Sequence, residues 1–85
     1  MYIGRSRQFD KQYNKLPKKI QQQFDSRFKL YLEDEANPLL KVHYLSGEYR
    51  GHQSFNVNAD VRAVFIRVLE KLYFVAIGSH SELYS

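Results

Sequence analysis

The sequence has 85 residues, which predicts one small domain over residues 1–85 with a simple, two-layered core. It contains no cysteine, no secretory signal and no apolar run near the roughly 18 residues of a membrane span, so we expect a soluble, cytoplasmic protein. The net charge of +4 fits an anionic partner, either nucleic acid or an acidic protein, or a merely basic soluble surface.

The N-terminal part of the chain predicts one short strand and two helices. Residues Tyr2–Arg5 form the strand, and Ser6 follows with a hydroxyl that suits a helix N-cap. Apolar residues recur at helical spacing over Arg7–Lys15. Pro17 suits the first turn of a helix and disrupts its interior, so a second helix should begin there and end at Asn37.

The C-terminal part of the chain predicts strands, because the period of its apolar residues falls to about 2. Residues 40–45 and residues 52–57 alternate between apolar and polar side chains. Residues Val61–Val68 are apolar at nearly every position, so this strand should be central in the sheet. Residues 72–77 form its hairpin partner, and Gly78 should break that strand.

The order of these elements predicts an α+β fold. We expect the two N-terminal helices to pack on one face of a small, mainly antiparallel sheet of four to five strands. The other face should stay open. Phe55 and Val57 should point toward the core. Their polar neighbours, His52, Ser54 and Asn56, should therefore line the open face.

The side chains that could carry chemistry belong to this β-rich part. His80 and Tyr84 follow the last strand, four residues apart, and His43 lies on an earlier strand. Asp60 closes a loop, and Arg62 follows two residues later, so both project to one side if the backbone is already extended. Folded together, these groups would surround one basic concavity.

Such a set of side chains suits the cleavage of RNA without a metal ion or another cofactor. RNA carries its own nucleophile, the 2′-hydroxyl, so the protein needs a base, an acid and a group that stabilises charge. Histidine, with a reference pKa of about 6.5, serves in either proton-transfer role. An arginine stabilises the phosphorane, and an aromatic ring stacks on a splayed base.

Each candidate also has a purely structural interpretation. His43 and His52 could be surface histidines on strands. Asp60 is a natural turn residue, and Arg62 could simply pair with it. Tyr84 could close the sheet as part of the core. Composition and spacing alone leave the choice between catalysis and these roles open.

Four short motifs, taken in order, add a resemblance to these observations. They begin at His43, Gly51, Asp60 and Ile77 and read HYLSG, GHQSF, DVRAVF and IGSHSELY. As a set they resemble the RelE/ParE superfamily of toxin–antitoxin toxins, and most of all its YafQ-type branch. The motifs cover the C-terminal half, while the N-terminal strand and helices agree in their order.

The resemblance implies a ribosome-dependent endoribonuclease that cuts mRNA in the 30S A site and is neutralised by a cognate antitoxin. By position, His43, Asp60 and His80 match acid–base residues of the YafQ-type pattern. Tyr84 matches its C-terminal aromatic residue, and Arg62 matches the phosphate-stabilising arginine of the wider family. Further candidates for contacts with RNA are Lys41, Arg50, His52, Asn56 and Lys71.

One position departs from the family pattern. Asn56 stands where YafQ-type toxins place a further histidine, and an amide is neither an acid nor a base near neutral pH. Either His52 substitutes from the same strand face, or the activity is weaker, or the enzyme relies on His80 and Asp60. Two alternative functions stay open: a ParE-like toxin of the same fold that inhibits DNA gyrase, and a weakened relative that acts by binding an antitoxin, which Asn56 supports.

Overall fold

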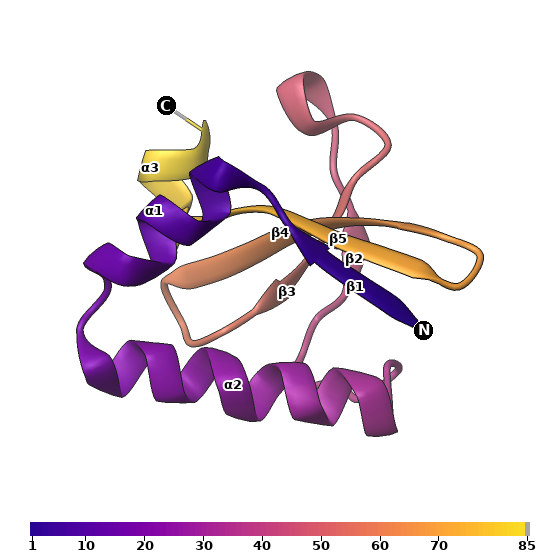
Figure 1. Ribbon diagram of the computed structural model, residues 1–85, viewed down its shortest axis with the longest axis horizontal. Coiled ribbons are helices and arrows are strands. Elements are labelled where there is room, and N and C mark those ends of the chain that lie inside the picture. The colour runs from indigo at the N-terminus through magenta and orange to yellow at the C-terminus, as the bar shows by residue number, and fades with distance from the viewer. Residues whose placement is uncertain (85) are drawn as a thin grey trace.

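The computed structural model describes residues 1–84, which form an α+β domain around a five-stranded sheet (Figure 1). The strands are β1 Tyr2–Arg5, β2 His43–Tyr44, β3 Gln53–Asn56, β4 Val61–Val68 and β5 Lys71–Ser79. They lie in the order β1-β5-β4-β3-β2, so β4 is central, as predicted. β1 runs parallel to β5 and the other neighbours are antiparallel, which confirms a mainly antiparallel sheet.

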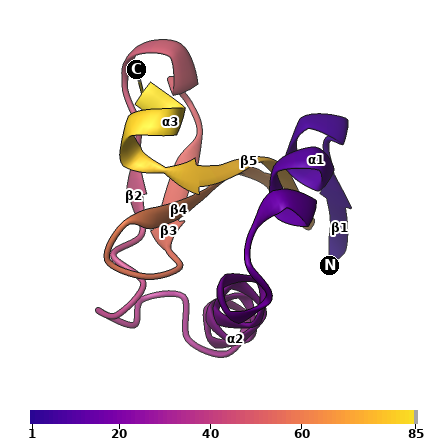
Figure 2. The ribbon, with the colours of Figure 1, turned by 90° about the vertical axis from the view of Figure 1, so that its left-hand side faces the viewer.

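Helices lie on both sides of this sheet. They are α1 Arg7–Lys15, α2 Lys18–Glu33, the short 3-10 helix η1 Gly47–Tyr49, and α3 His80–Tyr84. α2 lies on one side of β4 and β5, and α3 lies on the other side (Figure 2). None of the helices within residues 1–84 is both long and apolar enough to cross a membrane.

Ser6 joins β1 to α1 and ties both elements to the sheet. Its hydroxyl accepts the N–H of Phe9 at 2.9 Å, which caps α1, and donates to the carbonyl of Val75 at 2.8 Å. The N–H of Ser6 donates to the carbonyl of Phe74 at 2.8 Å, just beyond the parallel pairing of β1. The predicted N-cap therefore also fixes α1 against β5.

Aromatic rings fill the layer between the two N-terminal helices and the sheet. The ring centroids of Phe9 from α1 and Phe24 from α2 lie 5.3 Å and 5.2 Å from that of Phe74 on β5. Phe55 of β3 and Phe65 of β4 complete the cluster, and all five rings are buried. Aromatic pairs at these distances add to the stabilisation by burial. The main core thus lies on the predicted helix side.

The structure corrects several predicted boundaries. Residues 40–45 contribute only two residues to β2, because Lys41 has a φ of 48°, a left-handed conformation that interrupts extended backbone. Gly78 does not break the last strand, since β5 continues past it and Gly78 pairs with Arg62. α2 ends at Glu33 and not at Asn37, because Asp34 leaves the helical conformation, with φ −155° and ψ 79°, and a turn follows it.

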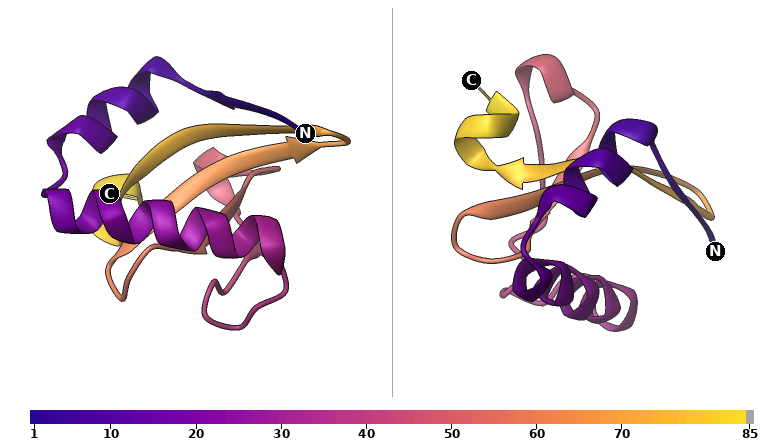
Figure 3. Two further views of the ribbon diagram at one scale, coloured as in Figure 1. Left: turned by 60° about the horizontal axis from the view of Figure 1, so that its bottom comes forward. Right: turned by 60° about the vertical axis from the view of Figure 1, so that its left-hand side comes forward.

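The sequence predicts that the sheet face away from α2 stays open. In the structure this face is partly covered. α3 folds back over it (Figure 3). Leu83 of α3 packs against Val64 and Ala76. Ser54 is fully buried rather than exposed on this face. The reason is that the residues after β5 form a helix with an apolar side, so they add a second, smaller apolar cluster to the domain.

Candidate active site

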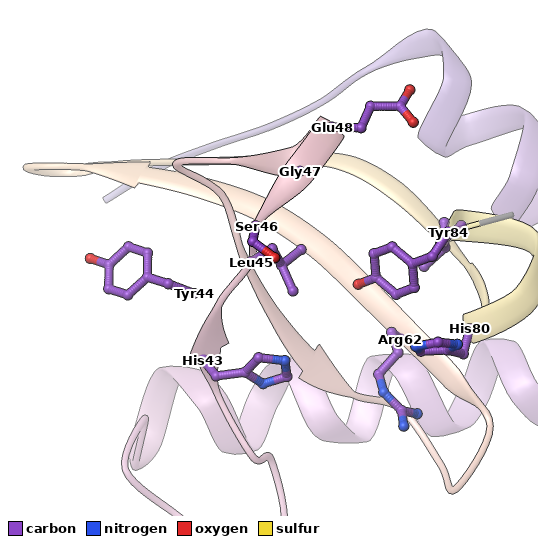
Figure 4. A pocket seen from close by; sticks show the side chains of 10 residues that line it. His43, Tyr44, Leu45, Ser46, Gly47, Glu48, Arg62, His80 and Tyr84 are labelled. Atoms are coloured by element: carbon purple, nitrogen blue, oxygen red, sulfur yellow. The ribbon is translucent and has the colours of Figure 1, made fainter.

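A cavity of about 630 Å³ opens on the sheet face that carries α3 (Figure 4). Its walls come from β2 and the segment that follows it, from β4, and from α3. The lining residues are His43, Tyr44, Leu45, Ser46, Gly47, Glu48, Arg62, His80, Leu83 and Tyr84. The fold thus brings four of the predicted catalytic residues, His43, Arg62, His80 and Tyr84, to one place.

His43 reaches the cavity from β2, an outer strand of the sheet. Its Nδ1 lies 2.8 Å from the carbonyl oxygen of Lys41, so Nδ1–H is the donor of this hydrogen bond. In the neutral ring, Nε2 then carries no proton and can accept one. The left-handed backbone at Lys41, with a φ of 48°, lies directly before β2. The local fold therefore selects the tautomer that a general base requires.

A capping box formed by Ser79 and Glu82 begins α3. Ser79 Oγ accepts the N–H of Glu82 at 3.2 Å, and Glu82 Oε1 accepts the N–H of Ser79 at 2.8 Å. Hydrogen bonds donated to the Glu82 carboxyl by the main chain and the side chain of Ser79 lower its pKa. The sequence prediction missed this device, although the Ser-x-x-Glu spacing is its known signal.

Gly78 leaves room for α3 to fold back on β5. A Cβ atom at Gly78 would lie 3.2 Å from Glu82 Oε1 and 3.7 Å from Leu83 Cδ2. The first distance is tighter than most real contacts, so a larger residue would push against the capping carboxylate. Gly78 is therefore a point of close approach within a strand. It allows α3 to present His80 from its first turn and Tyr84 from its end.

His80 and Tyr84 form a pair on one side of α3. Their ring centroids are 4.7 Å apart, and Tyr49 packs edge-on against Tyr84 at 6.1 Å. Burial raises the pKa of Tyr84, while the nearby hydroxyl of Ser54 and the charge of Arg62 lower it by less. The phenol is therefore protonated near neutral pH. Because Tyr84 is 36% exposed, its ring is accessible to a ligand in the cavity.

Arg62 brings a positive charge into the cavity from β4. Its Nη1 donates to the carbonyl of Ala59 at 3.2 Å. Within the described residues, the guanidinium forms no ion pair with Asp60, which was one predicted structural role. Glu48 also lines the cavity, but its carboxylate points away from the other labelled side chains (Figure 4). The charge of Arg62 is thus accessible to an anionic ligand.

Asp60 lies beside the cavity and not in its lining. It occupies an exposed turn before β4, where its N–H donates to Asn58 Oδ1 at 2.9 Å. Its carbonyl oxygen accepts the N–H of His80 at 3.2 Å. The structure thus connects Asp60 to the start of α3 through the main chain.

The five predicted RNA contacts lie outside the cavity lining: Lys41, Arg50, His52, Asn56 and Lys71. Asn56 is the cross-strand partner of Arg62, so the two side chains share a face. His52 packs edge-on against Tyr49, with 5.9 Å between ring centroids. Lys71 begins β5, whose other end leads to α3, and the rise of a strand separates these ends by about 25 Å. The fold does not bring Lys71 to this site.

The groups around the cavity can transfer protons and bind an anion. Two imidazoles supply proton donors or acceptors, and the guanidinium of Arg62 supplies a charged fork of donors. In the part of the chain that the structure describes, no three His, Asp or Glu side chains lie together as candidate metal ligands. The arrangement therefore has the parts for acid–base chemistry at a phosphate.

The sequence matches a known protein family over its full length. A profile of the family described as "Bacterial toxin of type II toxin-antitoxin system, YafQ" matches residues 1–85. A search of curated proteins found no significant match.

Three solved structures share the fold over nearly the whole chain. The crystal structure of YafQ from E. coli strain BL21(DE3) has a TM-score of 0.83 at 20% identity, covering 98% of this chain and 97% of that chain. YafQ from the E. coli DinJ-YafQ complex has a TM-score of 0.82 at 21% identity, with coverages of 98% and 97%. A metal-bound toxin from Helicobacter pylori has a TM-score of 0.73 at 26% identity, with coverages of 99% and 99%.

Proposed function

Because this chain belongs to the YafQ family of bacterial toxins from type II toxin–antitoxin systems, we propose that it is a ribosome-dependent, metal-independent endoribonuclease. The observation that carries the proposal is that His43, Arg62 and His80 line one cavity. Arg62 lies on the central strand β4, between Asn56 of β3 and Gly78 of β5. The substrate is mRNA in the 30S A site, and no cofactor takes part.

In this mechanism the two imidazoles move the protons. Nε2 of His43 removes the proton from the 2′-hydroxyl, whose oxygen attacks the adjacent phosphorus. The bond from phosphorus to the 5′ oxygen breaks, and His80 protonates that oxygen as it leaves. The products are a 2′,3′-cyclic phosphate and a 5′-hydroxyl. His43 has the tautomer for its role because Nδ1–H donates to the carbonyl of Lys41.

Arg62 and Tyr84 support this chemistry without exchanging protons. Arg62 donates to the non-bridging oxygens of the phosphate, whose negative charge increases in the transition state. Tyr84 stacks on a base and holds the phosphate in line for attack. The carboxylate of Asp60 lies outside the cavity lining, so we assign Asp60 the role of orienting His80 through its loop.

Expression in bacteria without an antitoxin tests the proposed function. The native chain should arrest growth and cut translated mRNA, whereas His80→Ala should lower cleavage by about 100-fold or more, the typical contribution of a general acid. Asp60→Asn should lose less activity than His43→Gln, because Asp60 contacts His80 through its main-chain carbonyl. Cleavage should persist when the Mg²⁺ that the ribosomes require is the only divalent metal in the reaction.

Two controls make this test specific. Arg62→Ala should be compared with Arg7→Ala, which removes an exposed arginine from α1, away from the cavity lining. Only the first variant should lose cleavage. The rate of supercoiling by DNA gyrase should not change when the native protein is added. Equal toxicity of the native chain and His80→Ala, or inhibition of gyrase without mRNA cleavage, would overturn the proposed function.

A cognate antitoxin is the second part of the proposed function. The E. coli relative crystallised in a DinJ-YafQ complex. The net charge of +4 on this chain fits an acidic antitoxin segment that covers the cavity. Co-expression of a small acidic protein encoded beside the toxin gene should restore growth, and the two proteins should elute together in gel filtration.

A further inference from the structure

Ser54 is a buried polar residue whose burial the fold does not require. The residue is 0% exposed, and its Oγ has no hydrogen-bond partner within the described structure. Burying a hydroxyl without a partner costs free energy, and alanine would fill the same position without that cost. The presence of a serine at this point therefore needs an explanation beyond packing.

The position of Ser54 places it under the candidate active site. On β3 it pairs with His43 of β2 on one side and with Val64 of β4 on the other. Directly paired residues project to the same face of a sheet, so the Ser54 side chain shares a face with the cavity-lining His43. Val64 in turn packs against Leu83 of α3, the neighbour of Tyr84.

The phenol of Tyr84 extends into the cavity, toward the segment that follows β2. In Figure 4 its hydroxyl points away from α3, toward Leu45 and Ser46 of the segment that follows β2. Burial is the largest influence on Tyr84 and raises its pKa, but the hydroxyl of Ser54 opposes it. The two hydroxyls are thus neighbours, although Ser54 Oγ meets no partner at ordinary hydrogen-bond geometry.

We propose that Ser54 is a positioning residue for Tyr84, whose phenol oxygen accepts a hydrogen bond from the Ser54 hydroxyl in solution. A single donor beneath the ring fixes the direction in which Tyr84 lies across the cavity. Tyr49 limits the ring from a second side, edge-on at 6.1 Å. That this orientation serves RNA stacking rests on the proposed function, whereas the contact between the two hydroxyls does not.

A double-mutant cycle in the ribosome-dependent cleavage assay tests the positioning role. Ser54→Ala and Tyr84→Phe should each lower cleavage by about five- to tenfold, and the double variant should lose no more than either one. Ser54→Ala should unfold close to the temperature of the native chain, since the loss of one hydrogen bond is offset by the removal of a buried hydroxyl. Ser26→Ala, on the exposed side of α2, is the matched control and should change neither quantity.

NMR titration of ¹³C-labelled tyrosine gives a readout that does not need catalysis. Removing the donor at Ser54 should raise the pKa of Tyr84, while the signal of Tyr73 at the far end of β5 should titrate as before. This shift supports the hydroxyl pair even if the native chain cuts no RNA, a result that would count against the proposed function alone. An unchanged Tyr84 titration, or additive losses in the double variant, would overturn the inference.

Discussion

Arg67 is a charged residue that holds two elements together on the helix side of the sheet. From β4 its Nη1 donates to the hydroxyl of Tyr31 on α2 at 2.9 Å and to the carboxylate of Glu35, just after α2. The hydrogen bonds to Tyr31 and Glu35 raise the pKa of Arg67, so its charge is permanent. Tyr31 is only 4% exposed, whereas the Glu35 side chain is 60% exposed. The contacts of Arg67 with Tyr31 and with Glu35 should therefore contribute differently to the free energy of unfolding.

Arg67→Ala should lower the free energy of unfolding by about 1–2 kcal/mol, because it leaves the buried Tyr31 hydroxyl without its partner. Glu35→Ala should lower it by about 0–1 kcal/mol, since water and salt screen an exposed carboxylate. Urea denaturation of both variants measures this difference in the free energy of unfolding, provided that its dependence on urea concentration is the same in both. Equal losses would show that the ion pair, rather than the hydrogen bond to Tyr31, supports this corner of the fold.

At the scale of elements, α3 depends on its capping box. Glu82→Ala should release the start of the helix, and with it His80, so that mRNA cleavage falls by about three- to tenfold, in line with a cap of about 1 kcal/mol. Glu82→Gln should retain most activity at neutral pH, because an amide oxygen also accepts the N–H of Ser79. Loss of activity in the glutamine variant would show that the charge of Glu82, and not the cap, is needed.

The same cap gives the stability of α3 a defined pH dependence. The pKa of Glu82 is lower in the folded chain than its ordinary value of about 4.5. The contribution of Glu82 to the stability of α3 is therefore complete at a pH above the ordinary pKa. It is lost as the pH falls through the lowered pKa of the folded chain. Amide exchange of α3 should accelerate over this acidic range in the native chain and stay nearly constant with pH in Glu82→Gln, once intrinsic exchange rates are subtracted.

Elements with strong local signals could be predicted from the sequence, and those that depend on a neighbour could not. The apolar run Val61–Val68 and the N-cap Ser6 before α1 carry their own signals, and both are present as predicted. The helical form of α3 was missed because Gly78 suggested a strand end. Strand alternation placed Ser54 on the correct face, but its burial depends on what packs over that face, which alternation alone does not predict.

For the whole molecule, the two faces of the sheet serve different purposes. The aromatic core on the helix side contains Phe9, Phe24 and Phe74, which join both helices to the sheet. The face that carries the cavity has a small apolar cluster, centred on Leu83 and Val64. Because the cavity rests on the smaller cluster, α3 should be able to loosen while the rest of the domain stays folded.

Truncation of one side chain in each cluster should therefore have different effects: a local one on α3 in the smaller cluster and a global one in the aromatic core. Leu83→Ala should lower cleavage by about tenfold or more and accelerate amide exchange in α3, because His80 and Tyr84 lose their support, while exchange in β4 stays slow. Phe24→Ala should cost about 3–5 kcal/mol, a large part of the stability of a small domain, and accelerate exchange throughout.

Val68→Ala is the control for the comparison, since Val68 is 58% exposed and lies outside both clusters. It should leave cleavage and exchange unchanged, because little apolar surface is lost from the interior. Hydrogen exchange measured residue by residue distinguishes local release of α3 from global unfolding. If Leu83→Ala accelerated exchange in β4 as much as in α3, the two clusters would form one cooperative unit, and the cavity could not loosen independently of the domain.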